Sequence, residues 1–269
     1  MKYIIILGDG MADTPVSELG DKTPLQCAHK PHMDRLAKRS EVGMVRTVPE
    51  GMPPGSDVAN LSVMGYDPHK YYTGRSPLEA ISMGINLDKS DVAFRCNLVT
   101  LSEEENYEEK IMIDYSSDEI STSEAELLIK EVQKHLNSEK FSFYPGISYR
   151  HCMVWHGGPK GLELVPHHDI LEKNIGEYLP SGDAGDVLLE MMKKSYDFLK
   201  DHPINRERRR RGLRPANSIW LWGEGKKPSL TSFYQAYGLK GSVISAVDLV
   251  KGLGICAGLK AVEVQGATG

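Results

Sequence analysis

The sequence lacks the features that mark several special classes of protein. No apolar run approaches the roughly 20 residues that a membrane-spanning helix needs, and the apolar residues 4–7 are too few for a secretory signal. The four cysteines stand singly, without a C-x-x-C pair or a dense framework, which indicates reduced thiols. The net charge of −5 gives no general reason to expect nucleic acid as a partner. We therefore expect a cytoplasmic protein that binds neither membrane nor nucleic acid.

Nucleotide-binding loops are also absent. The glycines at 252–258 do not match the dinucleotide fingerprint, because the segment follows an expected helix rather than a strand, and we interpret it as the end of that helix. The Gly-Lys pair at 225–226 lacks both the earlier glycine and the following Ser or Thr of a phosphate loop. The sequence therefore predicts no nucleotide cofactor.

The order of expected elements alternates between strand and helix. With 269 residues, the chain should bury roughly 70–75% of its unfolded surface, which is enough for a substantial core. We expect an α/β fold with a doubly wound sheet formed by residues 1–89 and 213–269, interrupted by an inserted α+β domain at 90–212. The expected strands and helices lie at 3–7, 31–40, 41–48, 92–100, 121–136, 140–144, 149–155, 184–199, 218–222, 230–237, 242–246, 247–252 and 261–264.

Two short segments point to phosphoryl chemistry. A Pro-Pro-Gly turn precedes Ser56 at the start of an expected helix, where free N–H groups and the helix dipole suit a phosphoryl group. Asp9 follows the apolar residues 3–7, at the end of an expected strand where open α/β sheets place ligand-binding groups. One acidic ligand and one serine suggest metal-assisted transfer through a phosphoserine. The alternative is that Asp9 ends a turn and Ser56 caps a helix.

An arginine run at 206–211 is the strongest cluster of charge in the chain. It is compatible with a solvated helix face or a nonspecific nucleic-acid patch. Because guanidinium groups bind carboxylate and phosphate through two hydrogen bonds, one or two of these arginines could instead hold a small phosphorylated acid.

Several long motifs closely resemble the archaeal-type, cofactor-independent phosphoglycerate mutases, and together they cover essentially the whole chain. They lie at residues 8–13, 53–62, 71–80, 143–146 with 149–151, 166–170, Asn205 with Arg208 and Gly212, 215–217 with 219–223, and 243–249. This family belongs to the alkaline-phosphatase-like metalloenzymes. The resemblance therefore implies a metal-dependent phosphatase-like domain that carries an inserted substrate-binding domain.

By position, the resemblance implies that Ser56 is the phosphorylated nucleophile and a metal contact, and that Asp9 is a metal ligand. Arg150, His151, Asp169 and Arg208 fall in motifs that resemble the substrate-binding elements of the insert. The implied cofactor is a divalent metal ion (manganese, magnesium, zinc or cobalt), with neither a nucleotide nor 2,3-bisphosphoglycerate. Family members have also been labelled homoserine kinases, which the missing nucleotide loop does not support.

The resemblance implies interconversion of 3-phosphoglycerate and 2-phosphoglycerate in two displacements, with an inserted domain that closes and excludes water. The alternatives are a related phosphatase or phosphomutase, or a fragment that binds an acidic metabolite without turnover. The oligomeric state is not indicated.

The similarity to the family also predicts that this chain is shorter than its relatives. Members continue for well over a hundred residues past the point that matches Gly269, and that part carries most of their metal ligands. We therefore expect a C-terminally truncated chain with weak metal binding and impaired activity.

Overall fold

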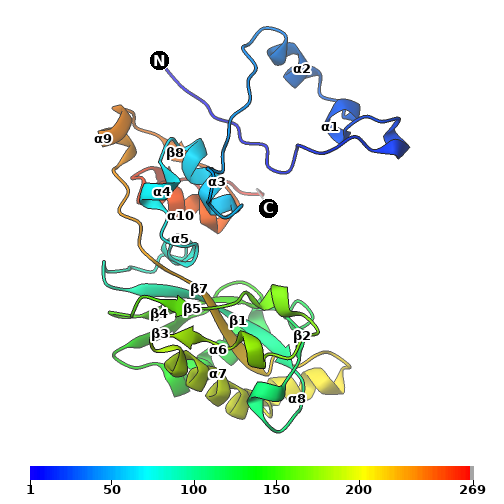
Figure 1. Cartoon of the computed structure of the whole chain (residues 1–269), viewed down its shortest axis with the longest axis vertical. Coiled ribbons are helices and arrows are strands. Elements are labelled where there is room, and N and C mark those ends of the chain that lie inside the picture. Colours follow the sequence, from blue (N-terminus) through cyan, green and yellow to red (C-terminus); the bar gives the residue numbers. More distant parts are fainter. Residues whose placement is uncertain (267–269) are drawn as a thin grey trace. The chain divides into compact units, whose positions relative to one another are not determined.

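The computed structural model describes residues 1–266, and its fold is mixed α/β (Figure 1). Residues 1–46 and the residues from Thr47 onward form two separate units. No helix within the described residues is both long and apolar enough to cross a membrane.

The first unit contains little regular structure. It holds a 3-10 helix, η1 (Ser17–Leu19), and the helices α1 (Pro24–Cys27) and α2 (Pro31–Ala37). Helix α2 confirms most of the helix expected at 31–40. It begins at Pro31, because proline is well tolerated in the first turn of a helix.

The strands expected at 3–7 and 41–48 are not formed, so these two predictions are wrong for the described chain. A strand needs a neighbour to receive its backbone hydrogen bonds, and neither segment has one among the described residues. Their apolar side chains are therefore exposed, with Ile4 at 84% and Ile6 at 90% of full exposure.

The second unit is built around a five-stranded antiparallel sheet, in which β1 pairs with β2, β4 and β7, and β4 also pairs with β3. The smaller pairings are antiparallel β5–β6 and parallel β8–β9. The strands are β1 (Val92–Leu101), β2 (Met112–Asp114), β3 (Phe141–Tyr144), β4 (Arg150–Trp155), β5 (Leu162–Glu163), β6 (Ser181–Gly182), β7 (Ser218–Lys226), β8 (Ser242–Val243) and β9 (Lys260–Ala261).

The helices of this unit flank the sheet or lie beyond its edge (Figure 1). They are α3 (Ser56–Val63), α4 (Pro68–Tyr71), α5 (Ser76–Ser82), α6 (Thr122–Leu136), α7 (Gly185–Leu199), α8 (Pro203–Arg210), α9 (Phe233–Tyr237) and α10 (Asp248–Cys256). Short 3-10 helices lie at η2 (Tyr107–Glu109), η3 (His167–Ile170) and η4 (Gly176–Tyr178).

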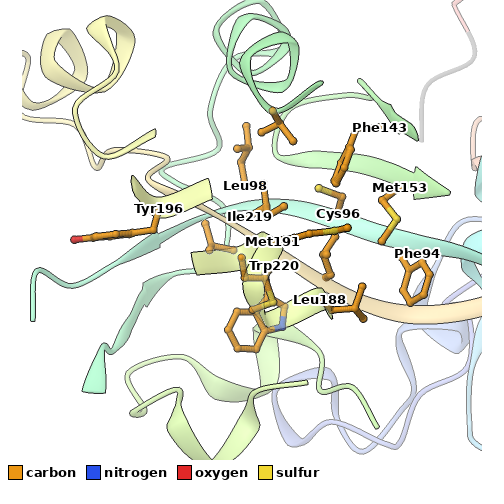
Figure 2. Packing of buried hydrophobic residues seen from close by; sticks show 14 of the residues in the cluster. Phe94, Cys96, Leu98, Phe143, Met153, Leu188, Met191, Tyr196, Ile219 and Trp220 are labelled. Carbon is orange, nitrogen blue, oxygen red and sulfur yellow. The ribbon is translucent and has the colours of Figure 1, made fainter. Parts of the chain in front are cut away.

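The main core lies between the sheet and helices α6 and α7. Helix α6 begins after Ser121, whose side chain accepts a hydrogen bond from the Glu124 N–H, and it buries one apolar stripe that includes Leu128 and Val132. Figure 2 shows Phe94, Leu98 and Trp220 among the residues of this cluster. Each large apolar side chain buried here contributes about 1.5–3 kcal/mol relative to its exposed state.

Helix α5 packs against β1 and β7, and with α3 and α10 it encloses a second core that includes Leu61, Leu78 and Leu253. Helix α10 connects the parallel strands β8 and β9, which forms one β–α–β unit. Within the described residues, this unit is the part of the expected parallel sheet that is formed. The glycines Gly252 and Gly254 lie inside α10, and Gly258 follows its end with a positive φ of +73°.

The backbone that leads into α5 crosses β7 at very close range. Thr73 is bonded to Lys226 twice, because the Lys226 N–H donates to the Thr73 carbonyl (3.2 Å) and the Thr73 hydroxyl donates to the Lys226 carbonyl (2.6 Å). A side chain at Gly74 would overlap the Glu224 carbonyl, and one at Gly225 would overlap the Thr73 carbonyl. This crossing therefore requires glycine on both segments.

The position of β7 bears on the domain boundaries. The predicted division has one domain formed by residues 1–89 and 213–269 and an inserted domain at 90–212. This division stays a prediction, because the unit from Thr47 onward is not divided further. Strand β7 follows residue 212, yet it pairs with β1 from Val92 to Val99. This pairing favours a boundary after Lys226.

Arg208 joins α8 to the start of α6. Its side chain is 2% exposed and donates to the Arg214 carbonyl (2.9 Å), the Ser117 carbonyl (2.6 Å) and the Glu124 carboxylate (2.7 Å). Ser117 has a positive φ of 51°, so the guanidinium also holds a turn with unfavourable backbone geometry. All three nitrogens of this guanidinium are thus used inside the fold.

Replacing Arg208 by alanine is expected to lower the free energy of unfolding by about 3 kcal/mol, because it leaves the buried Ser117 carbonyl without its donor and removes a donor from the partly buried contacts with Arg214 and Glu124. Urea denaturation followed by circular dichroism measures this loss. Arg210→Ala is the matched control, since Arg210 is exposed and its side chain is paired, within the described residues, with Glu207 of the same helix alone, and it should change stability little. Equal, small effects of both substitutions would contradict the structural role of Arg208.

Candidate functional site

A cavity of about 350 Å³ opens on the sheet, on the same strands that carry the core. Its wall combines two arginines with histidine, tyrosine and tryptophan side chains. The lining residues are Arg95, Tyr115, Tyr149, Arg150, His167, His168 and Trp222. A cavity with two cations and no carboxylate in its lining favours an anionic ligand.

Arg150 begins β4 and is the exposed cation of this wall. Its guanidinium lies over the ring of Tyr149, 5.6 Å from the ring centre, and forms no hydrogen bond or ion pair with any other described residue. The stacking holds the planar group while its N–H donors stay free. Such a group can bind a carboxylate or phosphate through two parallel hydrogen bonds.

Arg95 is the inner cation of the cavity, and its side chain is 12% exposed. One nitrogen lies 3.4 Å from the Glu79 carboxylate, which also pairs with Arg75 at 2.7 Å. The guanidinium carbon is 4.9 Å from the centre of the Trp222 ring. Burial lowers the pKa of Arg95, while Glu79 opposes that shift. Because guanidinium stays protonated in proteins, Arg95 keeps its charge in this cavity.

His167 closes the inner side of the cavity. It is 3% exposed, and neither ring nitrogen has a hydrogen-bond partner among the described residues. Burial lowers the pKa of His167 to about 3, and His168 and Arg95 add to the shift. The imidazole is therefore neutral at pH 7, so the positive charge of the cavity wall resides on the arginines.

Of the predicted substrate-binding residues, Arg150 is the one that lines the cavity. Asp169 is exposed and adjoins the cavity through His168, whose ring lies 3.8 Å from the Asp169 carboxylate. His151 follows Arg150 on β4, so its side chain points to the opposite face of the sheet, where it accepts a hydrogen bond from the Gly146 N–H (3.0 Å). Arg208 is enclosed by its structural partners, and this geometry does not support its predicted contact with substrate.

Ser56 is exposed in the first turn of α3, as its motif predicts. The next residue, Asp57, is buried and accepts a hydrogen bond from the Val58 N–H (3.0 Å). A side chain on Gly55 would overlap this carboxylate, so the Asp57 side chain would have to shift if Gly55 were replaced. Burial, followed by the Asp57 charge, raises the pKa of Tyr72 to about 12. The helix start thus combines an exposed serine with a buried aspartate at the next position.

Asp9 belongs to the first unit and Ser56 to the second, so their predicted shared metal site stays a prediction. Within residues 1–266, no three His, Cys, Asp or Glu side chains gather closely enough to hold a metal ion. The described residues therefore do not fit a complete metal centre.

Sequence reasoning did not single out Arg95, Tyr115 or Trp222. Arg95 carried a usable signal, because it is the one charged residue within the otherwise mostly apolar segment 92–101. A cation in a buried strand needs a specific partner or function. Trp222, which contacts Arg95, lies 127 positions further along the chain. Its contact with Arg95 depends on the pairing of β1 with β7, which no local sequence pattern indicates.

The two buried histidines predict a loss of stability in acid. The pKa of His151 and that of His167 are both lowered to about 3, whereas an unfolded histidine titrates near 6.5. The unfolded chain therefore binds more protons between these values, and stability should fall as pH falls from about 6.5 towards 3. The slope is at most about 1.4 kcal/mol per pH unit for each histidine.

Urea denaturation at pH 7 and pH 4.5 measures this effect. His151→Phe and His167→Phe should each flatten the pH dependence, whereas His69→Phe, at an exposed position, should leave it unchanged. A pH dependence that is identical in all four proteins would show that these imidazoles are not held neutral by burial.

Comparison with known proteins places this geometry in a family. The family profile of 2,3-bisphosphoglycerate-independent phosphoglycerate mutase matches residues 37–205. A protein of Geobacter sulfurreducens described as a probable 2,3-bisphosphoglycerate-independent phosphoglycerate mutase is 56% identical over all 269 residues, which span 67% of that relative. A 2,3-bisphosphoglycerate-independent phosphoglycerate mutase of Methanothrix thermoacetophila is 51% identical, and the match spans 66% of its length.

Two solved structures are similar to this chain in fold. The PH0037 protein from Pyrococcus horikoshii is 29% identical with a TM-score of 0.74, over 97% of this chain and 61% of that one. A cofactor-independent phosphoglycerate mutase from Thermoplasma acidophilum is 26% identical with a TM-score of 0.58, over 96% of this chain and 68% of that one. The chain thus spans about two thirds of the length of its relatives, and it belongs to the 2,3-bisphosphoglycerate-independent phosphoglycerate mutase family.

Proposed function

We propose that this chain carries the acid-binding cavity and the phosphoryl-accepting serine of an isomerase that interconverts 3-phosphoglycerate and 2-phosphoglycerate. The observation that carries the proposal is the unpaired guanidinium of Arg150 beside Arg95 in one cavity. Membership of the family supports the reaction, since the relatives are named for it.

The cavity suits a small acid in size and charge. A volume of about 350 Å³ is at the lower end for ligand sites, which run from about 300 to 1,000 Å³, and a three-carbon acid fits such a space. The substrate carries a carboxylate and a phosphate, and either group can receive two parallel hydrogen bonds from Arg150. Arg95 adds a second positive charge at the inner wall, where low exposure strengthens its attraction for an anion.

The proposed reaction has two displacements at phosphorus. The Ser56 hydroxyl oxygen bonds to the phosphorus of the bound phosphoglycerate, and the bond between phosphorus and the substrate oxygen breaks. The proton of the serine hydroxyl passes to that oxygen, which leaves as a hydroxyl of glycerate. The other hydroxyl of glycerate then takes the phosphoryl group from Ser56, and its proton passes to the serine oxygen, which restores the serine hydroxyl. The free N–H groups and dipole of the α3 N-terminus favour the negative charge of the phosphoserine.

A divalent cation enters this proposal through the family resemblance alone. When bound, it would neutralise phosphate oxygens and lower the pKa of the serine hydroxyl. Asp9 and Ser56 are the residues of this chain that the resemblance assigns to it. No further ligands come together within residues 1–266. The roles proposed for Arg95 and Arg150 are therefore supported by the cavity, and the role proposed for Ser56 by its place in the first turn of α3 and by the resemblance.

The acid-binding part of the proposal is tested by titrating 3-phosphoglycerate into the 269-residue chain by calorimetry. Arg150→Gln should weaken binding about 10- to 100-fold, because a charge-assisted pair of hydrogen bonds is lost. Arg206→Gln is the matched control, since Arg206 is an exposed arginine outside the cavity lining, and it should bind as the unsubstituted chain does. Equal binding by both variants would refute the cavity as the acid site.

The phosphoserine part is tested in the whole enzyme. After incubation with 3-phosphoglycerate, mass spectrometry should find phosphate on the peptide that contains Ser56, and an enolase-coupled assay should detect 2-phosphoglycerate. Ser56→Ala should abolish both signals, whereas Ser62→Ala on the same helix should keep them. Turnover that survives Ser56→Ala would refute the nucleophile, and release of inorganic phosphate in place of the isomer would identify a phosphatase.

A further inference from the structure

Trp222 lines the cavity and contacts several of its other lining residues, although the proposed reaction gives it no role. It stands directly opposite Arg95 in the pairing of β7 with β1, and the guanidinium lies 4.9 Å from its ring centre. On its other sides the indole ring meets His167 and His168, each with ring centres 5.3 Å apart. One side chain thus touches the inner cation and both histidines of the wall.

The indole itself is fixed. Its N–H donates a hydrogen bond of 2.8 Å to the side-chain oxygen of Asn97, and Asn97 is fully buried in β1. The ring of Trp222 can therefore neither flip nor slide along the strand without breaking this partly buried hydrogen bond. Asn97 and Arg95 are two positions apart on β1, so they share one face of the sheet.

We propose that Trp222, anchored by Asn97, is a positioning residue that holds the Arg95 guanidinium ready for the acid. This inference rests on the proposed function, because it takes the cavity as the site of phosphoglycerate. The carboxylate of Glu79 holds Arg95 from one side at 3.4 Å, and the face of the indole holds it from the other. The indole face attracts the guanidinium of Arg95 without using the N–H donors of that guanidinium, so these donors remain available for the ligand.

This arrangement reduces the conformational entropy that the Arg95 side chain loses when the acid binds. A free arginine side chain loses much rotational freedom when it grips an anion, whereas a guanidinium already stacked on a ring loses less. The interaction of a cation with an aromatic ring corresponds to a change of about 2- to 30-fold in a dissociation constant. The effect of Trp222 on affinity should therefore be visible and should pass through Arg95.

Calorimetric titration of 3-phosphoglycerate into the 269-residue chain tests the inference with four variants: Trp222→Leu, Trp222→Phe, Arg95→Gln and the double variant Trp222→Leu/Arg95→Gln. Trp222→Leu should raise the dissociation constant about tenfold, and Trp222→Phe, which keeps an aromatic face, about threefold. In the Arg95→Gln background, Trp222→Leu should add less than about twofold, because the residue it positions is gone.

Tryptophan fluorescence gives an independent measurement. The acid should change the emission of the unsubstituted chain, and the change should disappear in Trp222→Phe. The change in emission should persist in Trp155→Phe, because the indole of Trp155 packs against Phe94 and Phe141 and does not line the cavity. Thermal melting of each variant identifies any that fails to fold. If Trp222→Leu does not fold, the inference is tested by the dissociation constant of the conservative variant Trp222→Phe.

Two results would overturn the positioning role: an unchanged dissociation constant in both Trp222 variants, or a loss of affinity from Trp222→Leu that is equally large with and without Arg95. Either result leaves the proposed function intact if Arg150→Gln still weakens binding. If the unsubstituted chain does not bind 3-phosphoglycerate, or if Arg95→Gln and Arg150→Gln bind as it does, the acid-binding part of the proposed function fails, and the positioning role fails with it.

Discussion

The burial of one cation, Arg95, within the sheet governs the arrangement around the cavity. A charge that loses water is unfavourable unless other groups compensate it, and Arg95 is compensated by Glu79 on α5 and by the ring of Trp222 on β7. These two partners come from elements that lie on either side of β1 in the sequence. The need to satisfy one guanidinium therefore links helix α5, strand β7 and the cavity wall, and it explains why the stable core and the anionic site share the same strands.

Much of the second unit follows from its sequence pattern, because its helices and strands bury their apolar residues against one another. Helix α6 illustrates this, since Ser121 marks its start and its apolar spacing marks the buried face. The segments 3–7 and 41–48 have an equally clear strand pattern, yet no strand forms there. A run of apolar residues indicates a preference for burial, whereas a strand also needs a neighbouring strand, which no local pattern can supply.

The candidate site was predictable where short motifs carry it and unpredictable where distant residues meet. Ser56 was found from its Pro-Pro-Gly turn, and Arg150 from a motif of the family. Arg208 stood in a similar motif and in the strongest cluster of charge, yet the fold uses all of its nitrogens to hold a turn and the start of α6. Residue type alone cannot separate a guanidinium that binds a ligand from one that binds its own backbone, because both uses exploit the same donors.

The close crossing between the segment before α5 and the end of β7 has an evolutionary consequence. Gly74 and Gly225 face each other's backbones, although they lie 151 positions apart in the chain, and Thr73 is bonded twice to Lys226. A methyl group added on either segment would push the two apart and would move Glu79 away from Arg95. Substitutions at these two glycines should therefore be rare among homologues, and any that survive should be accompanied by a compensating change on the opposite segment.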